Sequence, residues 1–347
     1  METDQCLGGF QLNKAMVAYF ILSFLSGVIE LGIILFTIRN RMPLIYIPIM
    51  GLAYQIASLF KNPIRLSSKQ YLGITVFALA LSFFANCTES LLWIFTFTLS
   101  IGLQGMRTLA SDSCEVTTLS KRISRIFGFA TSILFDYPIF ILIPACLLVI
   151  FFVDRIDMVR QDALRINRNL RNDVLASTMV IHQSHYFTYA YFVPLLFLSS
   201  YNINPIFIGC VFSVGWISYS TSHTLFKKLY KDKHLLATVL VGHVLTSLAL
   251  FSLVSYTGNF LTSIVAWFLS GLGGGTVFCI RELHELSNKF SSDLDFWENL
   301  GHVTGLVVSL GAMSIFQNFY YVFAIAAMIA LSVAFVVTLI LPQKVVY

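Results

Sequence analysis

The segment VIHQSHYFTYAYFVP, residues 180–194, places hydrogen-bonding side chains near the middle of a long apolar stretch. His182, His185, Tyr186 and Tyr189 are spaced i, i+3, i+4 and i+7, so a helix carries them on one face. Histidine exchanges protons around an ordinary pKa of about 6.5. The stripe is therefore interpreted either as the wall of a cavity that binds substrate, a proton or both, or as interhelical hydrogen bonds that only pack helices together.

Metal binding at this stripe is not expected. Histidines at i and i+3 can share an ion, but two ligands with no acid or cysteine nearby are a weak zinc motif. His243 and His302 also lie in apolar runs, each next to a glycine, and we expect them to be packing hydrogen-bond groups. The six cysteines are scattered singly, without a C-x-x-C motif, which argues against a disulfide framework or a zinc site.

Glu30, in the apolar stretch SGVIELGII, is a second group that could do chemistry. A bare carboxylate in hydrocarbon is costly, so it should be protonated, paired or facing water. We interpret Glu30 as a proton-coupling carboxylate or a cation contact. The alternative is a carboxylate that pairs with Arg39 or Arg41.

The elements that position these residues are predicted to cross a membrane. Of the 347 residues, 57% are hydrophobic and 11% are charged, whereas soluble domains carry about 25% charged residues. Apolar runs of about 20 residues, enough for a helix to span a bilayer core of roughly 30 Å, recur along the chain. We expect the first of them to be a retained helix and not a cleaved signal peptide. The predicted spanning helices are residues 15–38, 43–60, 70–86, 90–110, 115–135, 137–153, 174–199, 205–225, 235–255, 260–280, 296–316 and 320–341.

The fold class expected from these runs is an all-α polytopic membrane protein with twelve transmembrane helices, or eleven if residues 115–153 form one helix. With twelve helices and cytoplasmic N- and C-termini, every Lys and Arg except Arg39 and Arg41 falls on the inner side. This asymmetry is the positive-inside pattern, and it explains the net charge of +5 without a nucleic-acid partner.

Two halves of the chain resemble each other. LSIGLQGMRTLA, residues 99–110, is similar to LSGLGGGTVFCI, residues 269–280. The predicted domains are an N-terminal six-helix bundle (1–153), a cytoplasmic linker (154–173) and a C-terminal six-helix bundle (174–347). Two pseudo-symmetric bundles of this kind are a known transporter plan.

Leu103-Gln104-Gly105 resembles the "l-q-G" of the helix-four motif of the major facilitator superfamily. The arginine that normally precedes the leucine by two residues is replaced by Ile101, and Arg107 lies just beyond the motif. The resemblance covers nearly the whole chain, mainly as topology. It implies two bundles that alternate access to a central cavity, which helices one and seven line.

The loop LFKNPIRLSSK resembles the basic loop between helices two and three of this superfamily, although it lacks the aspartate and both glycines. Asp112 resembles the acidic residue that pairs with that loop, and Arg65 is its expected partner. By this resemblance Arg65, Gln104, Arg107 and Asp112 are gating or structural polar residues. The compact chain and tyrosine-rich seventh helix are similar to bacterial small-molecule exporters, including siderophore, metallophore and drug exporters.

The predicted function is proton-coupled secondary transport, with export of a small polar or amphipathic molecule. An importer of a small organic solute is one alternative, and a non-transporting membrane scaffold or sensor is another. No Walker motif or G-x-S-x-G is present, and HELSN lacks the second histidine of a zincin, so we do not expect an enzyme. We expect a monomer in the bacterial inner (plasma) membrane whose partners are the lipid bilayer, protons and a small-molecule substrate, with no cofactor.

Overall fold

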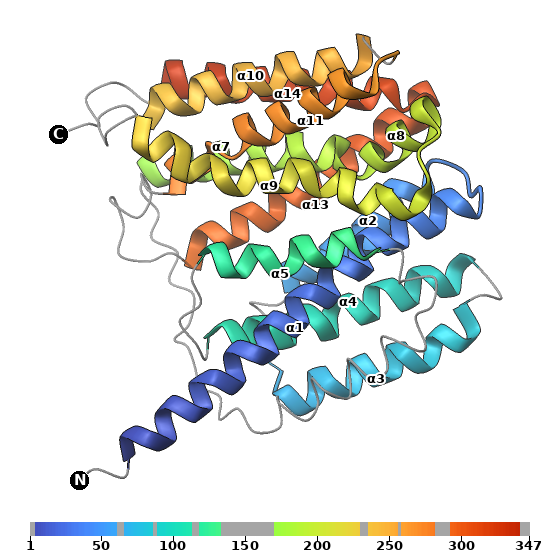
Figure 1. Cartoon of the computed structure of the whole chain (residues 1–347), viewed down its shortest axis with the longest axis vertical. Helices are drawn as coiled ribbons and strands as arrows, with labels where there is room; N and C mark the ends of the chain where they lie inside the picture. The colour runs from blue at the N-terminus through green and yellow to red at the C-terminus, as the bar shows by residue number, and fades with distance from the viewer. Residues whose placement is uncertain are drawn as a thin grey trace. The chain divides into compact units, whose positions relative to one another are not determined.

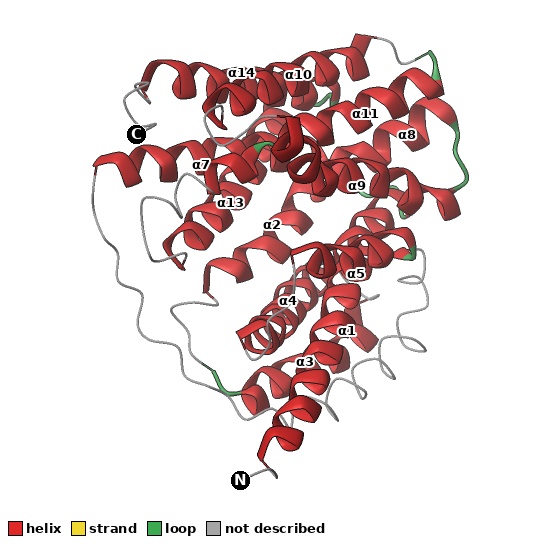
Figure 2. Cartoon of the chain, turned by 60° about the vertical axis from the view of Figure 1, so that its left-hand side comes forward, coloured by secondary structure: helices red, strands yellow, loops and turns green. Residues whose placement is uncertain are grey.

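The computed structural model describes residues 4–60, 66–85, 89–112, 118–132, 170–229, 235–255, 258–281 and 292–340. Within these ranges every regular element is a helix, and they contain no strand (Figure 2). The helices are α1 (Asp4–Arg39), α2 (Tyr46–Phe60), α3 (Ser68–Ala85), α4 (Glu89–Asp112), α5 (Thr118–Ala130), α7 (Leu170–Tyr189), the 3-10 helix η2 (Ala190–Phe192), α8 (Val193–Tyr201), α9 (Pro205–Leu229), α10 (Leu235–Ser255), α11 (Phe260–Gly274), α13 (Ser292–Phe316) and α14 (Tyr320–Ile340). Each overlaps a segment predicted to span, whereas the predicted helix 137–153 lies outside the described residues.

Several helices have the length and apolar character needed to cross a membrane. In the part of the chain that the structure describes, these segments are Met16–Arg39, Leu235–Ser255, Phe260–Arg281, Phe296–Phe316 and Tyr320–Thr338. Large apolar side chains point outward, with Leu261 68% and Ile315 73% exposed, while Glu30 and several histidines are buried. Soluble proteins tend to bury apolar side chains and expose polar ones. The opposite arrangement here fits a surface in contact with lipid, because the polar groups then lie in the interior. The chain is a multi-pass membrane protein.

Two compact units divide the chain. The first comprises Met1–Arg41 and Ala53–Ala163, and the second comprises Met42–Leu52 and Leu164–Tyr347. In the first unit α3 packs on α4, α4 on α1, and α1 on α5 (Figure 1). In the second unit α7 packs on both α13 and α14, α10 packs on α14 and α11, and α11 packs on α9. Glu30 therefore belongs to the first unit, and the histidines belong to the second.

Glycines bring specific helix pairs close together. Gly27 on α1 and Gly128 on α5 face each other, and a Cβ added to either would collide with the backbone of the opposite helix. Gly301 and Gly305 on α13 lie in the same way against the backbone of α7. Small residues allow such close backbone approach in membrane helices.

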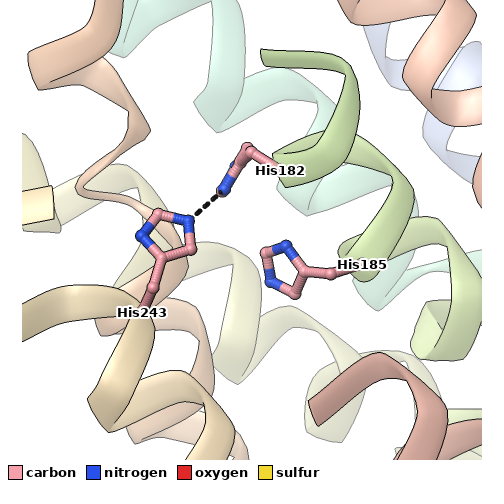
Figure 3. Close-up of side chains that lie close together, drawn as sticks. All are labelled: His182, His185 and His243. Atoms are coloured by element: carbon pink, nitrogen blue, oxygen red, sulfur yellow. Dashed lines mark hydrogen bonds between the residues drawn. The ribbon is translucent and has the colours of Figure 1, made fainter. Parts of the chain in front are cut away.

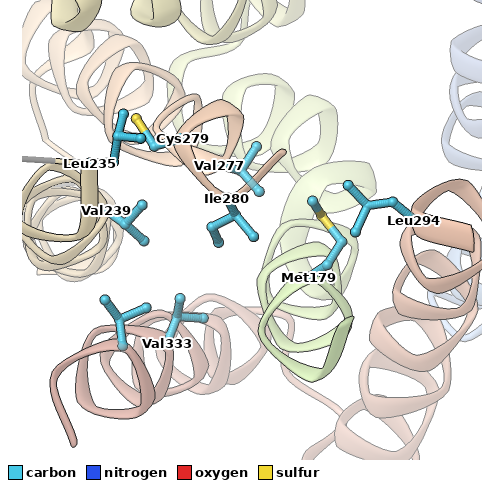
Figure 4. Close-up of a cluster of buried hydrophobic side chains, with 9 residues drawn as sticks. Met179, Leu235, Val239, Val277, Cys279, Ile280, Leu294 and Val333 are labelled. Atoms are coloured by element: carbon cyan, nitrogen blue, oxygen red, sulfur yellow. The ribbon is translucent and has the colours of Figure 1, made fainter. Parts of the chain in front are cut away.

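An apolar cluster in the second unit packs α7, α10, α13 and α14 together with residues 277–280 (Figure 4). Every side chain in it is buried, and it contains no charged residue. Its members are Met179, Leu235, Val239, Val277, Cys279, Ile280, Leu294, Val333 and Val337. The cluster lies next to the polar face of α7, because Met179 is on the turn before His182.

Two predicted helices are interrupted. The predicted helix 174–199 ends as α7 at Tyr189 and resumes as α8 after η2, where the Val193 N–H donates to the Ala190 carbonyl. Pro194 explains the break, because proline has no N–H to donate and its ring would clash with the carbonyl four residues earlier. The predicted helix 260–280 turns at residues 275–276, where the Thr276 hydroxyl donates to the Gly273 carbonyl at 2.7 Å.

Candidate functional site

Glu30 is buried within the first unit, with 3% of its side chain exposed. Gln55 Nε2 on α2 donates to Glu30 Oε1 at 3.0 Å. The other oxygen, Oε2, accepts from Nη2 of Arg125 on α5 in an ion pair. Pairing is one of the three states expected for this carboxylate, and the partner seen here is Arg125. Each carboxylate oxygen thus has a donor on a different helix.

A second set of hydrogen bonds surrounds the backbone next to Gln55. The Tyr54 hydroxyl donates to the Ser26 carbonyl at 3.1 Å. The Tyr54 carbonyl accepts from Ser100 Oγ at 2.5 Å and from Gln104 Nε2 at 3.3 Å. Gln104 also donates to Ser100 Oγ at 3.1 Å. Gln104, predicted to be a structural or gating residue, therefore bonds α4 to the stretch of α2 that carries the Glu30 partner.

The remaining predicted gating residues are only partly described. Arg107 lies on α4, one turn after Leu103, and is partly exposed. Asp112 is the last residue of α4, and its side chain lies outside the described part of the structure. Arg65 falls in the range 61–65, which is also outside it. The Arg65–Asp112 pair thus stays a prediction.

Three histidines meet inside the second unit (Figure 3). His182 and His185 come from α7 and His243 comes from α10, and all three are buried. The ring centroid of His182 lies 4.9 Å from the ring centroids of both His185 and His243. The His185 and His243 centroids are 5.6 Å apart. One nitrogen from each ring lies within 4.8 Å of the corresponding nitrogens of the other two. Among the described residues, this is therefore a group able to hold a metal ion.

Hydrogen bonding determines where the lone pairs of these neutral rings lie. His243 Nδ1 is 2.7 Å from the Val239 carbonyl, and because a carbonyl only accepts, Nδ1 carries the hydrogen. His243 Nε2 then presents its lone pair to His182 Nδ1, 2.7 Å away. His182 Nε2 and both nitrogens of His185 have no hydrogen-bond partner among the described residues. Buried polar atoms in native proteins normally have partners, so these three nitrogens are ready to bind another group.

The two tyrosines of the predicted stripe have different surroundings. Tyr189 is buried, with its ring stacked on His185 at 6.3 Å and in edge-to-face contact with Trp267 at 6.0 Å. Tyr186 is partly exposed and makes ring contacts with Trp216 at 5.9 Å and Tyr219 at 6.3 Å, both on α9. The polar face therefore divides into a buried part with the histidines and an aromatic part that is partly open.

A second carboxylate has the same kinds of donor as Glu30. Glu298 on α13 accepts from Gln183 Nε2 at 3.1 Å and forms an ion pair with Arg281. This pair is more open, because the Glu298 side chain is 23% exposed and the Arg281 side chain is 32% exposed. Glu298 thus offers a natural comparison for Glu30.

Comparison with known proteins places this geometry in a fold. The sequence matches no family model and no curated protein. Among solved structures, the nucleoside transporter NupG superposes with a TM-score of 0.68 at 13% identity, covering 96% of this chain and 99% of that one. The chain has the fold of major facilitator superfamily transporters.

Two further structures with this major facilitator fold are similar over almost their whole lengths. A bacterial homologue of the iron transporter ferroportin, in its inward-facing state, gives a TM-score of 0.67 at 11% identity, with 94% of this chain and 98% of that one covered. The human organic anion transporter TETRAN gives 0.60 at 11% identity, with 97% and 100% covered. NupG and TETRAN are transporters, and the third protein is a homologue of a transporter.

Two residues of these sites were missed by the sequence analysis. Arg125 was counted only among the positive charges of the inner side, although it lies on α5 within reach of Glu30. Its signal is Gly128, one turn later, which allows α5 to approach α1. His243 was expected only to pack, but it completes a three-histidine group. The sequence shows that His243 lies in the middle of an apolar run, but it does not show which helix His243 faces.

Proposed function

We propose that this protein is a proton-coupled secondary transporter of a small polar or amphipathic molecule, working by alternating access. The observation that carries the proposal is the buried Glu30 carboxylate, held inside the spanning helix α1 by Arg125 and Gln55. Ionisable residues inside membrane spans are costly and mark proton and substrate pathways. The fold neighbours support the class of activity, since they are a nucleoside transporter, an organic anion transporter and a homologue of an iron transporter.

The coupling step is a competition between a proton and Arg125 for the same carboxylate. While Glu30 is ionised, the guanidinium holds α1 to α5, and the attraction is strengthened by the low dielectric around a buried group. A proton on Glu30 removes that charge and releases Arg125, whose side chain is already 20% exposed. One proton thereby switches the α1–α5 contact between bound and released states.

Substrate contact is assigned to the aromatic part of the α7 face. Tyr186, Trp216 and Tyr219 are all partly exposed, and they combine ring surfaces with the hydroxyl groups of the two tyrosines. Such side chains suit an amphipathic ligand, because one end of the ring system is apolar and the other hydrogen-bonds. His182, His185 and Tyr189 are buried, so they would reach a substrate only if α7 moved away from its neighbours. A proton on the open Nε2 of His182 is the alternative coupling step.

The rest of the proposed organisation follows the charge pattern. We propose twelve spanning helices in two bundles, cytoplasmic termini, a monomeric state and a place in the bacterial inner membrane. Export is the proposed direction. Reporter fusions after each predicted helix test the topology, and a reporter facing the wrong side after residue 153 would reduce the count to eleven.

The test of transport begins with the substrate. Metabolites inside and outside cells with and without the gene are compared, and the compound that accumulates inside cells lacking the gene is the exported substrate; accumulation outside indicates import. Its transport is then measured in proteoliposomes under an imposed pH gradient. Glu30→Gln is expected to abolish the dependence on the gradient, while Glu298→Gln, with the same donor types, should retain it. A Glu30→Gln protein with the wild-type response would remove Glu30 from the mechanism.

A further inference from the structure

We propose that His182, His185 and His243 form a site for a divalent transition-metal ion of the zinc type, which links α7 to α10. This goes beyond the proposed transport function and does not depend on it. It also differs from the sequence-based expectation, which considered two histidines on one helix. The third ligand comes from a helix more than fifty residues later in the chain.

The positions of the nitrogens suit a small ion. Zinc binds imidazole nitrogen at about 2.0–2.1 Å in tetrahedral geometry, which places two ligand nitrogens about 3.4 Å apart. His182 Nδ1 and His243 Nε2 are now 2.7 Å apart, and all three ligand nitrogens fit within 4.8 Å. Side-chain rotations that move each nitrogen by about 1 Å or less would complete three corners of a tetrahedron.

One hydrogen bond already prepares His243 as a ligand. The Val239 carbonyl holds the Nδ1–H of His243, which fixes the tautomer with its Nε2 lone pair toward the site. Metal-bound histidines characteristically donate their other N–H to such a carbonyl. Neither ring nitrogen of His185 has a hydrogen-bond partner of ordinary geometry in the described structure, so coordination costs it little. His182 Nδ1 exchanges its hydrogen bond with His243 for a metal bond, and its proton moves to the open Nε2 of the same ring.

The donor set and surroundings select the class of ion. Imidazole nitrogens suit zinc, copper, nickel and iron, whereas magnesium and calcium need several oxygen ligands. Met179 and Val239, one turn before His182 and His243, belong to the buried apolar cluster (Figures 3 and 4). Tyr189 covers the next turn of α7 after His185. The ion would thus be enclosed and held by strong bonds, as in a resident site that fixes two helices.

Full-length protein, purified in detergent and stripped with a chelator, is titrated with Zn²⁺ against a chromophoric competitor. We expect about one tight site per chain, and Co²⁺ in its place should give the visible absorption bands of tetrahedral coordination. His185→Gln should weaken zinc binding at least about 100-fold, since even outer partners of metal ligands cost up to that amount. This variant is the sharpest probe because neither ring nitrogen of His185 has a hydrogen-bond partner of ordinary geometry in the described structure.

His302→Gln is the matched control, since His302 lies on α13 against Phe187 and outside the three-histidine group. It should bind zinc like the wild type, and so should Glu30→Gln, which separates this site from proton coupling. Zinc should raise the thermal midpoint of the wild type and not of His185→Gln. If His185→Gln does not elute as a folded species, His182→Asn replaces it. Wild-type zinc affinity no tighter than that of His185→Gln, or equal weakening by His302→Gln, would overturn the proposal.

Discussion

Arg125 on α5 donates to one oxygen of Glu30 on α1, while Gln55 on α2 donates to the other oxygen at 3.0 Å. One carboxylate therefore ties together three helices of the first unit. The two donors are not equivalent, because the guanidinium balances the charge of Glu30 and the amide only hydrogen-bonds to it. Loss of Arg125 leaves a buried charge, whereas loss of Gln55 leaves a charged pair intact.

Arg125→Gln is expected to destabilise the protein by about 3 kcal/mol, because removing one partner of a buried ion pair leaves the other charge uncompensated. The double variant Glu30→Gln with Arg125→Gln should recover much of this loss, since neither charge then remains. Thermal unfolding of purified protein in detergent measures both. A double-mutant cycle then gives the coupling free energy of the Glu30–Arg125 pair, apart from the effect of each substitution alone.

Arg281→Gln is the comparison for this prediction. Its partner Glu298 is also bonded to a glutamine, but the pair is partly exposed. Exposed pairs contribute little, and the expected loss is under about 1 kcal/mol. Equal losses at Arg125 and Arg281 would show that burial does not set the strength of the Glu30 pair.

The close approach of α1 and α5 gives a second prediction. Gly128→Ala places a methyl group against the backbone of α1, which cannot yield as a side chain can, and should lower the thermal midpoint and the yield of monodisperse protein. Gly73→Ala is the control, because a Cβ there meets nothing within 4 Å. Alanine is the better helix former by about 1 kcal/mol, so Gly73→Ala should be neutral or stabilising. A harmless Gly128→Ala would mean that α1 and α5 are not held at this distance.

The helices could be predicted from the sequence because few backbone conformations satisfy their own hydrogen bonds inside a membrane. Each spanning segment must satisfy its N–H and C=O groups internally, so length and apolar character are enough to locate it. The breaks at Pro194 and Thr276 follow from local chemistry that the hydropathy pattern does not weigh. Proline removes a donor, and the glycines before Thr276 weaken the helix.

The site was harder to predict, for a different reason. Hydropathy marks Glu30, His182 and His185 as polar residues that need partners, but it does not say which helix each of them faces. Arg125 and His243 are partners only through the packing of α1 on α5 and of α7 near α10. Those pairings depend on small residues and side-chain shape, and a single sequence carries no direct record of them.

Trp267 is expected to be a main packing residue of the second unit. Its ring is fully buried, and its Nε1–H donates to the carbonyls of Val211 at 3.1 Å and Phe212 at 3.2 Å. Gly215 leaves the space that the ring occupies. Trp267→Ala should therefore cost about 3–5 kcal/mol in thermal unfolding, as other large-to-small core changes do. Trp93→Ala, where the ring is 39% exposed, should cost far less, and similar costs would contradict the burial argument.

Tyr186 provides the last prediction, which concerns substrate contact. If the ring cluster of Tyr186, Trp216 and Tyr219 meets the substrate, Tyr186→Ala should raise the KM for transport about tenfold, the equivalent of roughly 1.4 kcal/mol of lost ring contact. Tyr186→Phe keeps the ring and should keep most of the affinity. Tyr321→Ala is the control, because Tyr321 is an exposed ring on α14 that stacks 4.6 Å from Phe316. An unchanged KM in Tyr186→Ala would place the substrate elsewhere, whereas equal increases for Ala and Phe would assign recognition to the hydroxyl group and not to the ring.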